Sequence, residues 1–181
     1  MNYKKILSTD ILRYTGISIV RCYQCGKCSA GCPMSENMDF TPNVIMRMLQ
    51  TEEKDTDEQI LGSQSIWLCT SCEMCVSRCP MEINIPKIMD YLRQHSLKKG
   101  LQNKKAKRNI IPFHCSFLDS IKHTGRLNEI GLIMRYKIKT LNLLQDLDIA
   151  FRMLIKGKLP LLPEMVKKKK QLSTIFKETK K

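Results

Sequence analysis

The sequence predicts an all-α protein in two parts, residues 1–100 and residues 101–181. Apolar residues recur every three or four positions, as in amphipathic helices. The alternation with a period of two that marks a strand is missing from the first part. The composition also changes near residue 100, because the first part holds 12 Lys and Arg against 11 Asp and Glu, whereas the second holds 19 against 6.

The expected helices of the first part have recognisable boundaries. Thr41-Pro42 suits the N-cap and first turn of a helix. The acidic run 52–58 is expected to form a solvated connector or a second short helix. Ile85-Pro86 opens a longer helix that ends near Gly100.

The second part is predicted to be a basic helical extension that follows a linker at 101–109. Apolar stripes run over 113–121 and 130–154, with a break near Asn142 and a stop at Gly157. We expect these stripes to be buried in a core or against a partner protein. Beyond them, a Lys-rich tail is expected to be mobile.

The compartment follows from two further features. No stretch approaches the ~20 apolar residues that a membrane span needs. The N-terminus becomes polar at Ser8, before the apolar core of a signal peptide can form, so a cytoplasmic location is expected. Because disulfides rarely persist there, the nine cysteines require another role.

Eight cysteines form two identical C-x2-C-x2-C-x3-C-P motifs, the second displaced by 47 residues: Cys22, Cys25, Cys28, Cys32 and Cys69, Cys72, Cys75, Cys79. Thiolates spaced in this way can hold three corners of a cuboidal 4Fe-4S cluster, so the duplication predicts two 4Fe-4S clusters. Four disulfides are disfavoured by the compartment. Zinc is the stronger alternative, but its sites usually pair two C-x2-C units across a longer gap.

The motif resembles that of two-cluster ferredoxins, in which the cysteine before proline ligates the other cluster. The resemblance implies two ligand sets. They are Cys22, Cys25, Cys28 and Cys79 for the first cluster, and Cys69, Cys72, Cys75 and Cys32 for the second. Crossed ligation of this kind couples folding to metal loading.

Charges near the motifs predict a difference between the clusters. Arg21, Lys27 and Arg78 adjoin ligands of the first cluster, whereas Glu73 lies inside the second loop. Because positive charge favours the reduced state, we expect the first cluster to have the higher reduction potential.

The remaining residues indicate no catalysis on this chain. The sequence has no G-x-G-x-x-G after a strand, no P-loop and no His-rich metal site, so it is predicted to conduct electrons between partners. Cys115 is expected to be buried and inert. No nucleic-acid motif accompanies the basic extension, which leaves an acidic protein partner or a solvated face.

Together, the motifs, the helical spacing between them and the approach Ile66-Trp67-Leu68-Cys69 resemble the α-helical ferredoxin domain. Succinate dehydrogenase, glycerol-3-phosphate dehydrogenase and heterodisulfide reductase all have iron-sulfur subunits with this domain. A preceding 2Fe-2S domain has no room before Cys22, and C-C-G repeats do not follow Pro80. The chain therefore resembles the small two-cluster iron-sulfur subunit of heterodisulfide reductase, and the stretches 114–118, 125–129 and 156–159 add to the resemblance.

This resemblance implies a non-catalytic electron-transfer subunit of an oxidoreductase. It would relay electrons from a flavin-bearing iron-sulfur subunit to the catalytic subunit, whose C-C-G motifs hold the site that reduces the CoM-S-S-CoB heterodisulfide in methanogenesis. A hydrogenase or a formate dehydrogenase is the candidate donor upstream. The alternatives are an electron-transfer subunit of another flavin-linked oxidoreductase and a free two-cluster ferredoxin.

Overall fold

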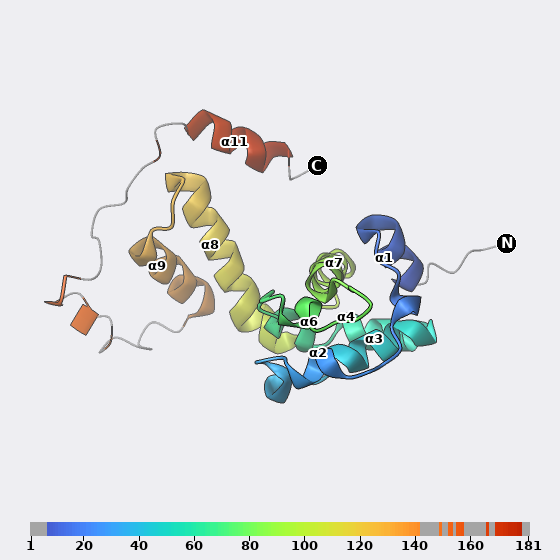
Figure 1. Ribbon diagram of the computed structural model, residues 1–181. Coiled ribbons are helices and arrows are strands. Elements are labelled where there is room, and N and C mark those ends of the chain that lie inside the picture. The colour runs from blue at the N-terminus through green and yellow to red at the C-terminus, as the bar shows by residue number, and fades with distance from the viewer. Residues whose placement is uncertain are drawn as a thin grey trace. The chain divides into compact units, whose positions relative to one another are not determined.

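The computed structural model describes residues 7–141, 149, 152, 153, 155–157, 166 and 169–178 (Figure 1). Every regular element in this part of the chain is helical, in agreement with the predicted fold class. None of the described helices is long and apolar enough to cross a membrane. The chain divides into two compact units, residues 1–106 and 107–181.

The first unit is built around one long helix, α7 (Ile85–Lys99). Four other helices pack against α7, namely α1 (Leu7–Thr15), α4 (Lys54–Leu61), α5 (Ser65–Leu68) and α6 (Met74–Ser77). The remaining elements are α2 (Lys27–Ala30), α3 (Pro42–Thr51) and the 3-10 turns η1 (Ile19–Arg21) and η2 (Ser35–Asn37). Figure 1 shows α7 in green, among these shorter helices.

Apolar side chains at helical spacing form the core of this unit. The fully buried ones include Ile11, Ile45, Met46, Leu49, Ile60, Leu61, Ile66, Ile88, Met89 and Leu92. Burial of such side chains contributes about 1.5–3 kcal/mol each to folding. One face each of α3 and α7 therefore lines this core, while Val44 and Leu97 on these helices are exposed.

Both predicted helix starts next to proline are confirmed. The helix α3 begins at Pro42, although the Thr41 hydroxyl donates to Asn43 Oδ1 at 2.8 Å instead of capping the helix. At the start of α7, Asn84 Oδ1 accepts a hydrogen bond from Lys87 N at 3.0 Å. Gly100 ends this helix with a φ of +70°, which glycine adopts without strain.

Asp39 ties the segment after the first motif to the helix that leads into the second. Its carboxylate accepts hydrogen bonds from Gln64 N at 2.7 Å, from Ser65 N at 2.9 Å and from the Ser65 hydroxyl. Partial burial acts to raise the pKa of Asp39, but these hydrogen bonds outweigh it and hold the pKa below its usual range. Asp39 therefore satisfies the free N–H groups at the start of α5.

We expect Asp39→Ala to lower the free energy of unfolding by about 1–2 kcal/mol, because it leaves these donors without a partner. The exposed Asp55→Ala variant is the control and should change it by less than about 0.5 kcal/mol. Because the folded pKa of Asp39 is depressed, its contribution is present at neutral pH and disappears as the pH falls through that pKa. Urea titrations at pH 7 and pH 3 measure both effects, and equal stability of the two variants at pH 7 would contradict the capping role.

The second unit contains α8 (Ile111–Thr124), α9 (Glu129–Thr140) and α11 (Lys169–Glu178). A π-helical turn, η3 (Ala106–Ile110), precedes α8. Within this unit α8 packs against both α9 and α11. The ring of Phe113 meets Tyr136 of α9 edge to face, with ring centroids 5.8 Å apart.

The apolar stripes of this unit are only partly buried within the chain. Phe113 and Leu118 are 43% and 52% exposed, and the buried residues of α8 are Ser116 and Ser120. Phe117 and Ile121 of the same stripe are half-buried, so its burial among the described residues is partial. Burial against a partner protein stays a prediction.

The helix α9 ends before the longer apolar stripe does. The helix α9 ends at Thr140, and Leu141 adopts a φ of +57°, close to the break predicted near Asn142. Asn142 itself, and most of the stripe beyond it, lie outside the described residues. Part of the Lys-rich tail also lies outside the described residues. Residues 169–178 of this tail form α11.

Candidate metal centre

The two cysteine motifs have the same backbone conformation. Gln24 and Ser71, which occupy equivalent positions, have φ values of +62° and +54°. Gly26 and Glu73 are also equivalent, with φ values of +75° and +61°. Each pair precedes a four-residue helix, α2 or α6, at the same place in its motif. The duplication seen in the sequence is therefore a duplication of structure, and it requires left-handed conformations of non-glycine residues.

Hydrogen bonds repeat at the same displacement. Cys32 N donates to Ser29 O at 3.1 Å, and Cys79 N donates to Val76 O at 3.0 Å. A backbone hydrogen bond also closes the first turn of each short helix. Its acceptor is Gly26 O in one motif and Glu73 O in the other. Each loop therefore directs its cysteines in the same manner.

The motifs themselves contribute little to the apolar core. Neither α2 nor α6 has a buried residue. The cysteine side chains are partly buried, except those of Cys25 and Cys72, which are exposed. The helix α2 packs against α3, α6 packs against α7, and the two short helices pack against each other. This contact brings the motifs together.

Cysteines of both motifs line one cavity beside α7. Cys32 of the first motif lies there with Cys69, Cys72 and Cys75 of the second. Apolar and thioether side chains form most of the remaining wall, including Met34, Met38, Met74, Ile85 and Met89. Four soft thiolate donors in apolar surroundings are the chemistry that an iron-sulfur cluster requires.

The thiols of the other predicted set are also neighbours. The pKa of Tyr23 is raised, first by partial desolvation and then by a hydrogen bond to the Cys25 sulfur and by the charges of Cys79 and Cys22. Burial and the charge of Cys22 likewise raise the pKa of Cys28. Cys79 of the second motif is therefore near Tyr23, which follows Cys22 in the first motif. Among the residues that the structure describes, no three His, Cys, Asp or Glu side chains form a group ready to hold a single metal ion.

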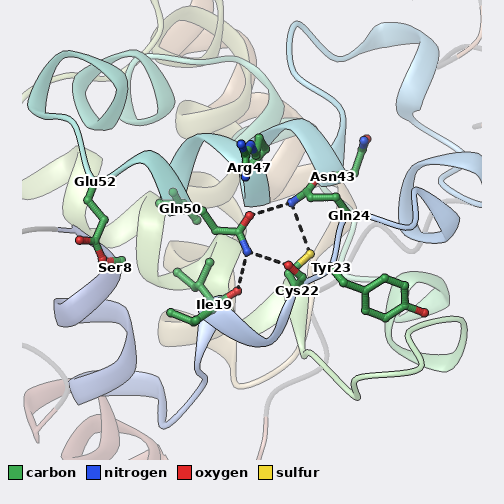
Figure 2. Close-up of a pocket in the computed structure, with 11 residues that line it drawn as sticks. Ser8, Ile19, Cys22, Tyr23, Gln24, Asn43, Arg47, Gln50 and Glu52 are labelled. Carbon is green, nitrogen blue, oxygen red and sulfur yellow. Dashed lines mark hydrogen bonds between the residues drawn. The ribbon is translucent and has the colours of Figure 1, made fainter.

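A pocket adjoins Cys22, between η1 and α3 (Figure 2). In its wall, Gln50 Nε2 donates to Cys22 O at 2.7 Å and to Ile19 O at 3.2 Å. The Gln24 amide lies between the Gln50 side chain and Cys22 Sγ, 3.4 Å from the sulfur. These contacts anchor the start of the first motif on α3, a link that the spacing of the cysteines does not indicate.

Two arginines bind the motifs in ways that the sequence does not predict. A Cβ atom placed on Gly31 would lie 2.5 Å from Arg78 Nη1, so the Arg78 guanidinium rests on the Gly31 backbone. Its charge is therefore beside Cys32 as well as Cys79, one cysteine from each predicted ligand set. The other is Arg93, which lies far from the motifs in sequence and donates to Cys69 O.

Cys115 belongs to the second unit, and the prediction for its burial is wrong. Its side chain is exposed on α8, in the second unit. The neighbouring Ser116 is the buried residue of that turn, because α8 turns its serine face inward. The prediction rests on the usual burial of a free cysteine, which this position on α8 does not follow.

The raised thiol pKa values predict that cluster assembly depends on pH. Burial, followed by the charge of Cys69, raises the pKa of Cys75 to about 11. Because iron binds the thiolate, loading releases this proton, and the apparent affinity should rise about tenfold per pH unit for each proton released. In the apo-protein the same shift lowers stability as the pH rises from 9 towards 11.

Anaerobic Fe(II) uptake in competition with a chelator, between pH 6.5 and pH 8, measures this dependence. Cys115→Ser is the control and should show the same slope. A pH-independent affinity would contradict the ligand role of buried thiols.

Comparison with known proteins agrees with this geometry. A family model described as a 4Fe-4S dicluster domain matches residues 18–83, which contain both motifs. A 4Fe-4S dicluster domain is therefore found at residues 18–83. Its cofactors are two 4Fe-4S clusters, and the cysteines at 22–32 and 69–79 fit them.

The chain is similar to iron-sulfur subunits of heterodisulfide reductases, those designated C. It is 34% identical over 97 residues to one such iron-sulfur subunit of the CoB-CoM heterodisulfide reductase of Methanocaldococcus jannaschii. The aligned region covers 54% of this chain and 48% of the relative. It is 34% identical over 88 residues to the equivalent subunit of Methanopyrus kandleri, covering 49% and 44%. With the corresponding subunit of the H2:CoB-CoM heterodisulfide, ferredoxin reductase of Methanothermobacter thermautotrophicus it shares 30% over 99 residues, covering 55% and 52%.

These matches confirm the resemblance drawn from the motifs of the 4Fe-4S dicluster domain. The match spans about half of this chain and about half the length of the relatives. The wider resemblance over residues 114–159 stays a prediction.

Proposed function

We propose that this chain is a non-catalytic electron-transfer subunit of a cytoplasmic heterodisulfide reductase. It receives electrons from a subunit that holds a flavin and iron-sulfur clusters. It passes these electrons to a catalytic C-C-G subunit that reduces the CoM-S-S-CoB heterodisulfide. The observation that carries the proposal is the cavity that Cys32 shares with Cys69, Cys72 and Cys75, in a domain similar to an iron-sulfur subunit of heterodisulfide reductase. Each cluster, when bound, gains or loses one electron at a time.

We assign the ligands in crossed sets. Cys69, Cys72, Cys75 and Cys32 hold one cluster, and the shared cavity supports this set. Cys22, Cys25, Cys28 and Cys79 hold the other, supported by the charges that Tyr23 and Cys28 experience. Crossing joins the two loops, so that each cluster is held by both motifs.

The chain's own residues control access to these thiolates. The methionines and Ile85 exclude water from one side of the cavity and so limit proton and oxygen access to the thiolates behind them. Cys25 and Cys72 are the exposed members of the two sets, which makes their side of each loop the natural place for electron exchange with a partner.

The basic second part is proposed to dock an acidic partner surface. Exposed apolar residues on α8 and α9, such as Leu118 and Met134, lie among basic ones, such as Lys122 and Lys137. An acidic patch with apolar residues would complement such a mixture. A hydrogenase or a formate dehydrogenase would then supply electrons through the flavin subunit.

Anaerobic purification of the tagged chain from its own cells tests this function. We expect it to copurify with a C-C-G subunit and a flavin subunit, as identified by mass spectrometry, and to hold about eight irons. Copurification with a different flavoprotein would favour another flavin-linked oxidoreductase. A monodisperse monomer with eight irons would favour a free two-cluster ferredoxin, and a zinc-containing chain would contradict both.

A further inference from the structure

Arg93 of α7 forms a clamp on the backbone that enters the second motif. Its Nε donates to Ile66 O at 2.5 Å, and its Nη2 donates to Cys69 O. Its Nη1 is 3.0 Å from Asp90 Oδ1, one turn earlier on the same helix. The guanidinium is therefore held on three sides, at the point where α5 ends and the second motif begins.

This position suits an arginine for a physical reason. The last carbonyl groups of a helix have no partner within the helix, and the planar guanidinium satisfies two groups of this region at once. The Arg93 side chain is 15% exposed, whereas its partner Asp90 is 55% exposed. Water screens the carboxylate more than the guanidinium, so the net field around the clamp is positive.

We propose that Arg93 is a positioning residue for the cluster of the second motif, one that fixes Cys69 and raises the reduction potential of that cluster. The proposal rests on the proposed function, because it takes Cys69 as a ligand. Reduction adds one electron to a cluster with four thiolates, changes their net charge from 2− to 3− and transfers no proton. A fixed cation nearby stabilises the more negative state, so the clamp favours reduction.

The Arg93 contact alters the difference in reduction potential that the charges next to the motifs predict. Glu73, inside the second loop, predicts a lower potential for the second cluster. Arg93 is 24 residues from Cys69 in sequence, yet it is bonded to the backbone of this ligand, while Glu73 is exposed. Glu73 lines the cavity of this set, so the two charges act on the second cluster in opposite directions, and the less screened Arg93 offsets the effect of Glu73.

An anaerobic redox titration of the iron-loaded full chain, with dithionite as reductant and EPR as the readout, tests the proposal. In Arg93→Gln we expect one midpoint to fall so that the ratio of reduced to oxidised cluster at a fixed potential drops about tenfold, or about 59 mV for one electron. Arg93→Lys keeps the charge and should shift the midpoint less. Asp90→Asn removes the opposing charge and should move the same midpoint upward.

Controls separate charge from position. Lys98→Gln removes one exposed charge from the same helix and should leave both midpoints unchanged. Lys27→Glu, inside the first motif, should lower the other midpoint and so identify which wave belongs to which cluster.

The outcomes are distinct from those for the proposed function. If Arg93→Gln keeps about eight irons and both midpoints are unchanged, the proposal is overturned. If Arg93→Gln loses iron, the Asp90→Asn variant tests the proposal instead. Unchanged midpoints in Asp90→Asn would show that the clamp acts only as a structural brace and would overturn the proposal. If the unmodified chain does not hold two clusters, the proposed function itself fails.

Discussion

We expect Cys32→Ser to disrupt the cluster of the second motif and to leave that of its own motif intact. Cys32 shares a cavity with Cys69, Cys72 and Cys75, so its loss removes the fourth thiolate from that set. Iron should fall from about eight to about four per chain. Cys79→Ser should have the converse effect on the cluster of the first motif.

Matched variants identify which cluster is lost. In the crossed arrangement, Cys32→Ser has the EPR spectrum of Cys72→Ser, because both variants damage the same cluster. If ligation were confined within each motif, Cys32→Ser would instead match Cys25→Ser, and the crossed assignment would be wrong. Cys115→Ser controls for the loss of a thiol and should retain all its iron, since Cys115 is exposed on α8 in the other unit.

Removal of iron is expected to release both loops while the helical core persists. The short helices α2 and α6 bury no residue, so we expect ligation to supply a large share of their stability, beside their contacts with α3 and α7. Ile88, Met89 and Leu92 of α7 are fully buried and keep their contacts without metal. Amide exchange in residues 22–32 and 69–79 should accelerate on the order of a hundredfold after anaerobic chelation, with much smaller changes in α7.

Hydrogen exchange followed by mass spectrometry measures this difference. The control region is 111–140, which belongs to the second unit and holds no predicted ligand. Equal protection of the loops before and after chelation would show that packing, and not metal, orders them. Loss of protection throughout the first unit would show instead that the core needs the clusters.

Much of the fold and of the site could be predicted because their signals are local. The starts of α3 and α7 follow from Pro42 and Pro86, and the end of α7 follows from Gly100. The displacement of 47 residues between the motifs reappears in the φ values of Gln24 and Ser71. Spacing alone therefore carries the geometry of each loop.

The contacts that join distant segments could not be predicted in this way. Asp39 caps α5 across 25 residues, and Arg93 reaches Cys69 across 24. Polar residues of these types are common on helix surfaces, and only packing decides which of them meets a backbone group. Cys115 shows a different limit, because a free cysteine is usually buried whereas this one is exposed on α8.

Iron and acid-labile sulfide content, with an EPR-monitored reductive titration of the anaerobically purified chain, tests the two-cluster electron-transfer account most directly. The account predicts about eight irons and eight sulfides per chain and two separate one-electron waves. It also predicts that a fully reduced chain gives up two electrons to an added acceptor. A chain with four irons, with a single wave or with zinc in place of iron would contradict it.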